Sequence, residues 1–351
     1  MATGATLKKV GGKQKLAVTQ THGTIDDTRP LVREASLKEY SKDTWAGNGF
    51  TKHFKEHADT HNFTLYGNDA DYGAHAEAFK RGHHWGLAVD LNTCIGCNAC
   101  VPACHIENNV PIVGQEEVHR AHEMHWIRID RYYSSDGQPG TEEYIDSLEN
   151  PRVTFMPLMC QHCDNAPCEN VCPVAATNHS SEGLNQMAYN RCIGTRYCAN
   201  NCPYKVRRFN WFDYQAADSF YKDTIFDNDE YALVEDLSRM VLNPDVTVRS
   251  RGVIEKCSFC VQRLQEGKLE AKKDGRKLAD GDIKTACQAA CPTHAIAFGD
   301  MNDPESEVSK LKARDRNYAL LEEIHVVPSV SYLVQIRNTE EALNHDDHGH
   351  G

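Results

Sequence analysis

The stretch CIGCNACVPAC, residues 94–104, spaces four cysteines by two, two and three residues. Two-residue gaps let a loop wrap three thiols around one face of a compact metal centre, whose fourth ligand must arrive from elsewhere. Two-cluster ferredoxins use the same C-x2-C-x2-C-x3-C run, in which the fourth cysteine ligates the other cluster. The run therefore predicts ligation of iron–sulfur clusters.

Three further runs resemble the first. The 15 cysteines fall into four groups: Cys94, Cys97, Cys100, Cys104; Cys160, Cys163, Cys168, Cys172; Cys192, Cys198, Cys202; and Cys257, Cys260, Cys287, Cys291. The second run has a four-residue gap, and the fourth has a long insertion. Proline follows the last cysteine of the later three runs, whereas His105 follows the first run. Strand-like residues precede each run, so a cysteine-plus-strand unit repeats along the chain.

The third run has Thr195 where its second cysteine is expected. A threonine hydroxyl is a poor iron ligand because it stays protonated near neutral pH, whereas a metallated thiol becomes a thiolate. Three thiolates suit a [3Fe–4S] cluster. The alternative is a [4Fe–4S] cluster with threonine or water at its fourth iron.

Zinc and disulfide bonds are the alternatives to iron–sulfur clusters at these cysteines. Zinc ribbons use two Cys-x-x-Cys pairs, a spacing that keeps zinc possible mainly at residues 257–291. Disulfide scaffolds are usually shorter, and their cysteines are more widely spread. A structural module with metals that only stabilise loops is the competing class of function. Redox titration would separate the two classes, because zinc is redox-silent.

Composition narrows the possible partners. The net charge is -12 over 351 residues, with both signs mixed, which argues against nucleic-acid binding. The chain has no apolar run of 18 residues and no recognisable export signal, so we expect neither a transmembrane helix nor a leader.

The basic run YKVRRFNW, residues 204–211, is interpreted as a solvated strand or loop edge. The alternative is a contact surface close to a cluster.

The sequence predicts an α+β fold with long loops. Residues 1–86 are expected to form an extended arm, either ordered by a partner or partly disordered. Residues 87–338 should form the cluster-binding domain, and residues 339–351 a His-rich flexible tail. Strands are predicted within 86–91 and 124–133, and a short helix after the third cysteine of the first run. The insertions 132–150 and 213–250 should be rich in loops.

Longer stretches around the cysteines carry a family resemblance. They include CNACVPACHIENN (97–109), CQHCDNAPCENVCPVAATNHSSEGLNQMAYNRCIGTRYCANNCPYKVRRFNWFDY (160–214) and CPTHAIAFGDMNDPESEVS (291–309). Across residues 87–338 the chain resembles the four-cluster electron-transfer subunits of molybdopterin oxidoreductases. More narrowly, it resembles the ferredoxin-like iron–sulfur part of alternative complex III. The quinone reductase complex of sulfate reducers is the nearest alternative.

The resemblance implies four ligand sets, because in that family the first run pairs with the fourth and the second with the third. Set a is Cys94, Cys97, Cys100, Cys291; set b is Cys257, Cys260, Cys287, Cys104; set c is Cys160, Cys163, Cys168, Cys202; and set d is Cys192, Cys198, Cys172, with Thr195 at the vacant corner. Sets a to c would hold [4Fe–4S] clusters and set d a [3Fe–4S] cluster. The clusters would lie in a row within two ferredoxin-like modules.

The resemblance also implies a function without a catalytic site in this chain. The subunit would relay electrons from a quinol, within a membrane complex, toward a cytochrome c or similar acceptor. The alternative is the iron–sulfur subunit of a quinone reductase or of a dimethyl sulfoxide or polysulfide reductase. His119, His122 and His125 are expected to be structural residues rather than haem ligands.

The implied partners are an integral-membrane quinone-binding subunit, a multi-haem cytochrome c and a separate molybdopterin-type subunit. Many members of alternative complex III carry the molybdopterin-type domain in the same chain, and this sequence departs from that pattern. The implied location is peripheral, on the periplasmic face of the membrane. Export would then occur together with a signal-bearing partner.

Overall fold

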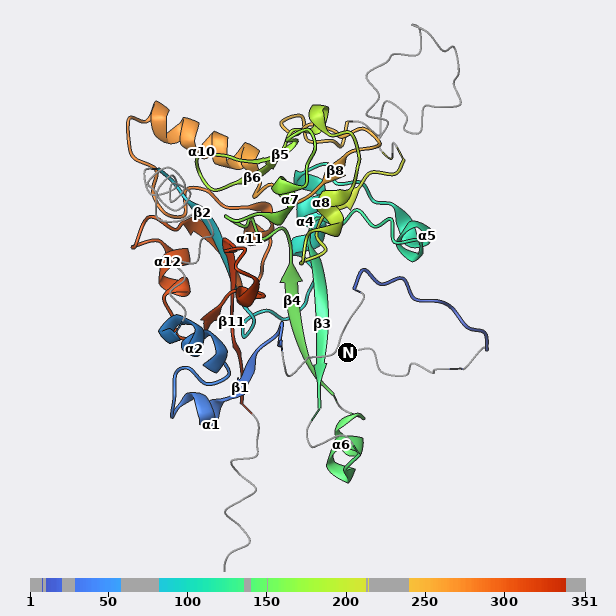
Figure 1. The fold of residues 1–351 in the computed structure, drawn as a ribbon, viewed down its shortest axis with the longest axis vertical. Coiled ribbons are helices and arrows are strands. Elements are labelled where there is room, and N and C mark those ends of the chain that lie inside the picture. Colours follow the sequence, from blue (N-terminus) through green and yellow to red (C-terminus); the bar gives the residue numbers. More distant parts are fainter. Residues whose placement is uncertain are drawn as a thin grey trace, which may run out of the picture.

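The computed structural model describes residues 8, 11–20, 29–57, 82–135, 140–149, 151–212, 214 and 240–338 (Figure 1). These residues combine short helices and strands with long loops, in line with the predicted α+β class. The predicted tail 339–351 and much of the 213–250 insertion lie outside the described residues.

The central sheet joins the segment before the first run to the segment after the fourth. It has four strands in the order β10-β11-β2-β9, with bounds β2 Trp85–Asp90, β9 Ile296–Asp300, β10 Asn317–Tyr318 and β11 Val330–Leu333. Strand β2 runs antiparallel to β9 and parallel to β11. Its first five residues are buried, which explains why it reads as a continuous apolar run.

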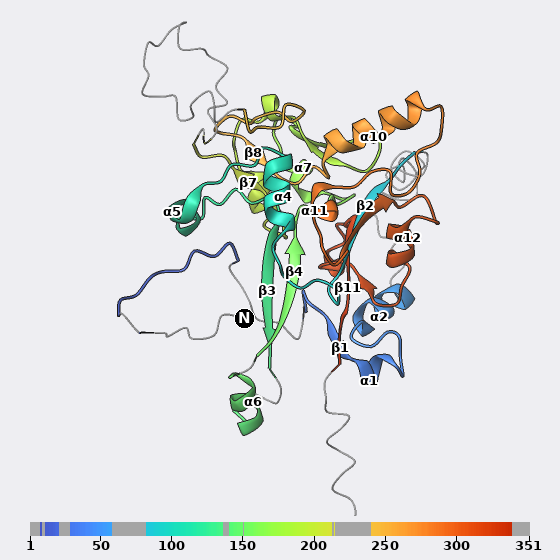
Figure 2. The ribbon, with the colours of Figure 1, turned by 180° about the vertical axis from the view of Figure 1, so that it is seen from behind.

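Among the described residues between the first and fourth runs, the strands form three antiparallel pairs. They are β3 (Arg128–Ser134) with β4 (Arg152–Leu158), β5 (Thr177–His179) with β6 (Asn185–Met187), and β7 (Arg208–Phe209) with β8 (Ile254–Glu255). The long β3–β4 hairpin extends away from the cysteine loops in both views (Figures 1 and 2). The predicted strand within 124–133 therefore exists, but it begins at Arg128.

The insertion 132–150 is more regular than expected. Helix α6 (Glu142–Ser147) lies near the far end of the β3–β4 hairpin (Figure 1). The Tyr144 N–H donates to Thr141 Oγ1 at 3.2 Å. A threonine that accepts from the first turn in this way stabilises the start of a helix. The loop prediction was therefore wrong for residues 142–147.

Most other helices adjoin cysteine runs. Among the described residues, four helices contain cysteines of the runs: α4 (Cys100–Glu107), α7 (Pro167–Asn170), α8 (Tyr197–Asn200) and α11 (Ala286–Ala289). The others near the domain are α5 (Gly114–His119), η2 (Tyr189–Arg191), α10 (Val261–Lys273), α12 (Glu307–Lys312) and η4 (Glu322–Ile324). Helix α4 matches the short helix predicted at the first run.

Part of the N-terminal region folds against the domain instead of extending from it. Strand β1 (Glu34–Ser36) pairs in parallel with β12 (Gln335–Arg337), and helices α1 (Leu37–Tyr40) and α2 (Gly49–His57) follow. Buried Arg33 anchors this segment: it donates to Asn48 at 2.7 Å, to Thr51 at 2.5 Å and to Glu322 at 2.8 Å. The expectation of an extended arm missed this docking, because the partner strand lies about 300 residues away.

Arg33→Met should detach the N-terminal segment, because it breaks a buried ion pair with Glu322. We expect the free energy of unfolding to fall by about 3–5 kcal/mol, and residues 29–57 to become accessible to proteases. Urea denaturation and limited proteolysis of the cluster-loaded protein measure both effects.

Arg29→Met is the matched control. The Arg29 side chain is 69% exposed and lies 3.7 Å from Glu323, so its loss should cost about 0–1 kcal/mol. Equal effects of the two substitutions would refute the anchoring role of Arg33.

The hydrophobic core includes the cysteine loops. Six cysteines belong to the main buried cluster: Cys100, Cys104, Cys160, Cys163, Cys168 and Cys198. They lie among apolar side chains such as Leu87, Met156 and Phe259. Within the described ranges, no helix is both long and apolar enough to cross a membrane.

Candidate metal centres

The four cysteine runs share one backbone feature at their second ligand position. The residue just before that position has a positive φ in every run: 66° at Gly96, 44° at His162, 73° at Gly194 and 55° at Phe259. Such a left-handed residue turns the loop sharply between the first and second positions. Thr195 therefore occupies the place that corresponds to Cys97, Cys163 and Cys260.

Gly194 is required at its position for a second reason. A Cβ atom built there would lie 2.5 Å from the carbonyl oxygen of Gly252. The third run is therefore pressed against the loop that leads to β8, and only glycine allows that approach.

The last cysteine of each of the later three runs is followed by the same backbone conformation. Each is followed by proline, and the third residue after it has a positive φ: 49° at Ala175, 51° at Lys205 and 54° at His294. The next N–H then points back to sulfur, as in the bonds from Ala176 to Cys172 and from Ala295 to Cys291, both 3.2 Å. Hydrogen bonds of this kind stabilise a thiolate.

Helix packing pairs the runs. Helix α4 of the first run packs against α11 of the fourth, and α7 of the second packs against α8 of the third. The first run thus meets the fourth, and the second meets the third. Proteins with two-cluster modules exchange their fourth cysteines between runs that meet in this way.

The thiols of set a line one small pocket: Cys94, Cys97, Cys100 and Cys291. The Gly96 turn brings that loop against the Phe155 ring of β4, since a Cβ at Gly96 would lie 2.3 Å from the ring. Burial, with the neighbouring thiols of Cys287, Cys94 and Cys291, raises the pKa of Cys100 to about 12. Cys287 belongs to set b, so sets a and b are neighbours.

The thiols of sets b and c are also brought together. Burial raises the pKa of Cys104, with further rises from Cys257, Cys260 and Cys287. Burial likewise raises the pKa of Cys163, with contributions from Cys160, Cys202 and Cys168. Cys160 of set c is also among the groups that raise the pKa of Cys257 in set b. Sets b and c therefore adjoin each other.

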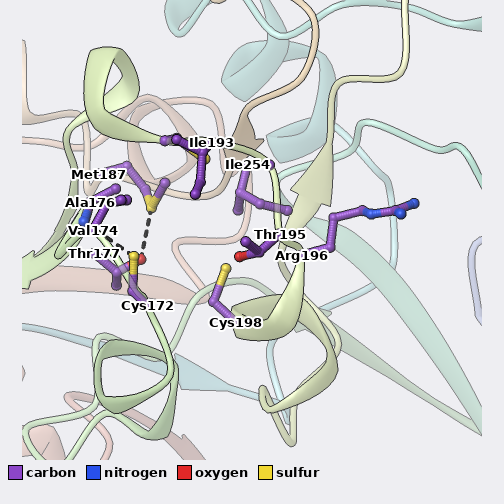
Figure 3. Close-up of a pocket in the computed structure, with 12 residues that line it drawn as sticks. Cys172, Val174, Ala176, Thr177, Met187, Ile193, Thr195, Arg196, Cys198 and Ile254 are labelled. Carbon is purple, nitrogen blue, oxygen red and sulfur yellow. Dashed lines mark hydrogen bonds between the residues drawn. The ribbon is translucent and has the colours of Figure 1, made fainter.

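The thiols of set d surround a second pocket together with Thr195 (Figure 3). Cys172, Cys192 and Cys198 line it, along with apolar atoms of Ile254. In Figure 3 the Thr195 side chain lies beside Cys198 and faces the same space. Arg196 points away from it, and its guanidinium lies over the rings of Phe209 and Trp211.

The buried thiols suit a metal cluster as their charge partner. Burial raises the pKa of Cys168 to about 11 and that of Cys260 to about 12, so both are neutral thiols at pH 7 without metal. A bound metal deprotonates its thiol ligands outright. Four such thiols around a pocket are the donor set that iron–sulfur clusters use.

A single metal ion fits the geometry less well. Across the described residues, no three His, Cys, Asp or Glu side chains come close enough together to hold one ion. The thiols of a zinc site all lie about 2.3 Å from the metal, whereas a cluster of several irons holds its thiols farther apart. Metal analysis of the purified protein distinguishes zinc from iron at residues 257–291.

The basic run at residues 204–211 is not a solvated edge, and that interpretation was wrong. Arg207 is only 5% exposed and Arg208 only 8%. Arg208 pairs with Glu123 at 2.6 Å, while Arg207 donates to Cys168 Sγ at 3.0 Å. The alternative, a contact surface close to a cluster, does not describe these arginines either, because both are buried; Arg207 instead contacts a thiol of set c from inside the protein.

Two more polar neighbours of the thiols were also missed. Asn108 donates toward the sulfurs of Cys104 and Cys260, both at 3.7 Å. Buried Lys256 donates to the carbonyl oxygens of Asn185 and Cys257. In the sequence, both residues are marked only by their closeness to a cysteine run. Closeness to a run does not show whether a polar side chain is buried or solvated.

Of the three histidines expected to be structural, His122 and His125 pack against aromatic rings. His122 lies 2.8 Å from Glu117 and stacks on Trp211. His125 packs edge-on against His105, with ring centroids 4.9 Å apart. Their expected structural role remains a prediction.

Comparisons with known proteins identify iron–sulfur domains at the first three cysteine runs. Two family models, each described as a 4Fe-4S dicluster domain, match residues 93–176 and 151–219. Over 253 residues the chain is 38% identical to the iron-sulfur cluster-binding subunit of menaquinone reductase from Nitratidesulfovibrio vulgaris. That alignment covers 71% of this chain and 88% of the relative. The chain belongs to the iron–sulfur subunits of molybdopterin-type oxidoreductases.

Two more relatives of this iron–sulfur subunit show the breadth of the family. This chain is 34% identical to the iron-sulfur subunit of a putative dimethyl sulfoxide reductase of Halobacterium salinarum, over 71% of this chain and 79% of the relative. It is 31% identical to the Hdr-like menaquinol oxidoreductase iron-sulfur subunit 1 of Archaeoglobus fulgidus, over 73% and 85%. These relatives support the broad family but not the narrower resemblance to alternative complex III.

Proposed function

We propose that this iron–sulfur subunit relays electrons between a quinone site and a molybdopterin-type subunit in a membrane-bound oxidoreductase. Sets a, b and c would each hold a [4Fe–4S] cluster, and set d a [3Fe–4S] cluster beside Thr195. When bound, the clusters supply one-electron redox chemistry at potentials set by the surrounding protein. The chain's own residues supply thiolates, exclude water and fix the spacing of the sites.

The observation that carries this proposal is the continuity of the four sets. Cys287 of set b neighbours Cys100 of set a, and Cys160 of set c neighbours Cys257 of set b. Arg207 interacts with the thiols of Cys168 in set c and Cys198 in set d. Electrons tunnel efficiently only over short distances, so a relay needs an unbroken series of neighbouring sites.

The relatives bear on the choice of partners. Their names include a menaquinone reductase and a menaquinol oxidoreductase, which favours a quinone-binding membrane partner here. The relation to a dimethyl sulfoxide reductase subunit favours a molybdopterin-type partner as a separate chain. None of these names supports a multi-haem cytochrome c, so the proposal leaves that partner out. The proposed location is peripheral, on the periplasmic face.

Purification of the intact complex tests this function. We expect about 15 iron atoms per chain, from three four-iron clusters and one three-iron cluster, and no stoichiometric zinc. The co-purifying subunits should include a polytopic membrane protein and a molybdopterin-type protein. Addition of a reduced quinone analogue should reduce the clusters. Redox-silent metal, or a chain that purifies without partners, would contradict the proposal.

A further inference from the structure

Arg207 lies in the short segment between the third cysteine run and β7, at the junction of sets c and d. Its guanidinium donates to Cys168 Sγ at 3.0 Å and to Asn185 Oδ1 at 2.8 Å through Nη2. Through Nη1 it donates to Thr177 Oγ1 at 3.1 Å and to Met187 Sδ at 3.3 Å. Thr177 and Met187 both line the pocket of set d. The side chain therefore spans the wall between the two sets.

Arg207 also interacts with a second cysteine, Cys198, which belongs to set d. Burial raises the pKa of Cys198, while the charge of Arg207 and its hydrogen bond with this thiol oppose the rise. Arg207 thus acts on Cys168 of set c and Cys198 of set d at the same time.

The charge of Arg207 has no obvious partner apart from the thiols. Among the described residues, its hydrogen-bond partners include a hydroxyl, an amide and three sulfur atoms, but no carboxylate. A buried charge is costly unless it is paired. The neighbouring Arg208 follows that rule, since Glu123 neutralises it at 2.6 Å. For Arg207, the groups whose charge acts on it are thiols, among them Cys168 and Cys198, and such thiols carry a negative charge when they ligate a metal.

We propose that Arg207 is a shared positioning residue that raises the reduction potentials of the clusters in sets c and d. This inference rests on the proposed function, because it requires clusters at both sets. Reduction adds one negative charge to a cluster, and a fixed cation nearby stabilises the reduced state more than the oxidised one. Hydrogen bonds to the cysteine sulfurs act in the same direction.

The test is a redox titration of the purified complex monitored by electron paramagnetic resonance. Centres c and d are assigned from the signals that Cys163→Ser and Cys198→Ser alter. In Arg207→Gln, the ratio of reduced to oxidised cluster at a fixed potential should fall about tenfold at both centres. For a one-electron centre, that change equals a shift of about 59 mV. Centres a and b should keep their potentials.

Two further variants separate charge from structure. Arg207→Lys keeps the cation, so it should restore more than half of the lost potential at one or both centres. Arg208→Gln removes the same unit charge from an adjacent buried arginine whose hydrogen bonds go to Glu123 and the His125 carbonyl oxygen, so it should shift the ratio at centres c and d less than Arg207→Gln does.

Three results would overturn the proposal: unchanged potentials in Arg207→Gln with full iron content, an equal shift at all four centres, or loss of iron from both Arg207 variants. The last would assign Arg207 to folding alone. A wild-type complex without redox centres at sets c and d would instead refute the proposed function, before any variant is compared.

Discussion

Removal of iron should unfold the region that spans residues 90–300. The sites join segments that are far apart in sequence, since Cys94 meets Cys291 and Cys163 meets Cys202. Six of the cysteines also form part of the main hydrophobic core. Without clusters, nothing covalent holds the paired runs together, and the core loses its centre.

The expected size of this effect follows from known magnitudes. A single structural zinc site in a small peptide contributes about 10–16 kcal/mol of apparent binding energy, whereas a whole domain is stable by only about 5–15 kcal/mol. Arg207 adds to the loss, because an unpaired buried charge costs about 3–5 kcal/mol once its partner is removed. The iron-free chain should therefore have no cooperative unfolding transition.

Near-ultraviolet circular dichroism and hydrogen exchange measure the outcome. We expect loss of the aromatic signal and of amide protection in β2 and β9 after treatment with an iron chelator under reducing conditions. Reductant without chelator is the control and should change neither. A chain that keeps native protection after complete iron removal would show that the clusters are not part of the folding core.

The second large effect is expected for Thr195→Cys. Thr195 lines the set d pocket with three thiols, and its backbone position matches that of Cys97, Cys163 and Cys260. A cysteine there completes a four-thiol site, so the centre should change from three irons to four. Total iron should rise from about 15 to about 16 atoms per chain.

The paramagnetic signal of the oxidised protein should show the substitution more clearly than the iron content does. An oxidised three-iron cluster is paramagnetic, whereas an oxidised four-iron cluster is silent, so the signal of the air-oxidised protein should disappear. The potential of this centre should also fall, because cluster type is a main determinant within a range of roughly -700 to +450 mV. Thr195→Ser is the control and should keep the signal. A wild-type protein that is silent when oxidised would refute the three-iron assignment.

Much of the local structure could be predicted from the sequence. The cysteine spacing identified the metal chemistry, because a loop with two-residue gaps has few ways to present its thiols. The apolar run before the first cysteines predicted strand β2, and the helix that starts at Cys100 was also expected. These features depend on neighbours within a few residues, where chain geometry leaves little freedom.

The tertiary structure decided the long-range features. Spacing alone did not specify which runs meet; that pairing came from a family resemblance, and the structure brings α4 to α11 and α7 to α8. The docking of Arg33 onto Glu322 and the burial of Arg207 beside Cys168 had no local signal. Whether a charged side chain is solvated or buried depends on which distant segments cover it. No short pattern in the sequence records that environment.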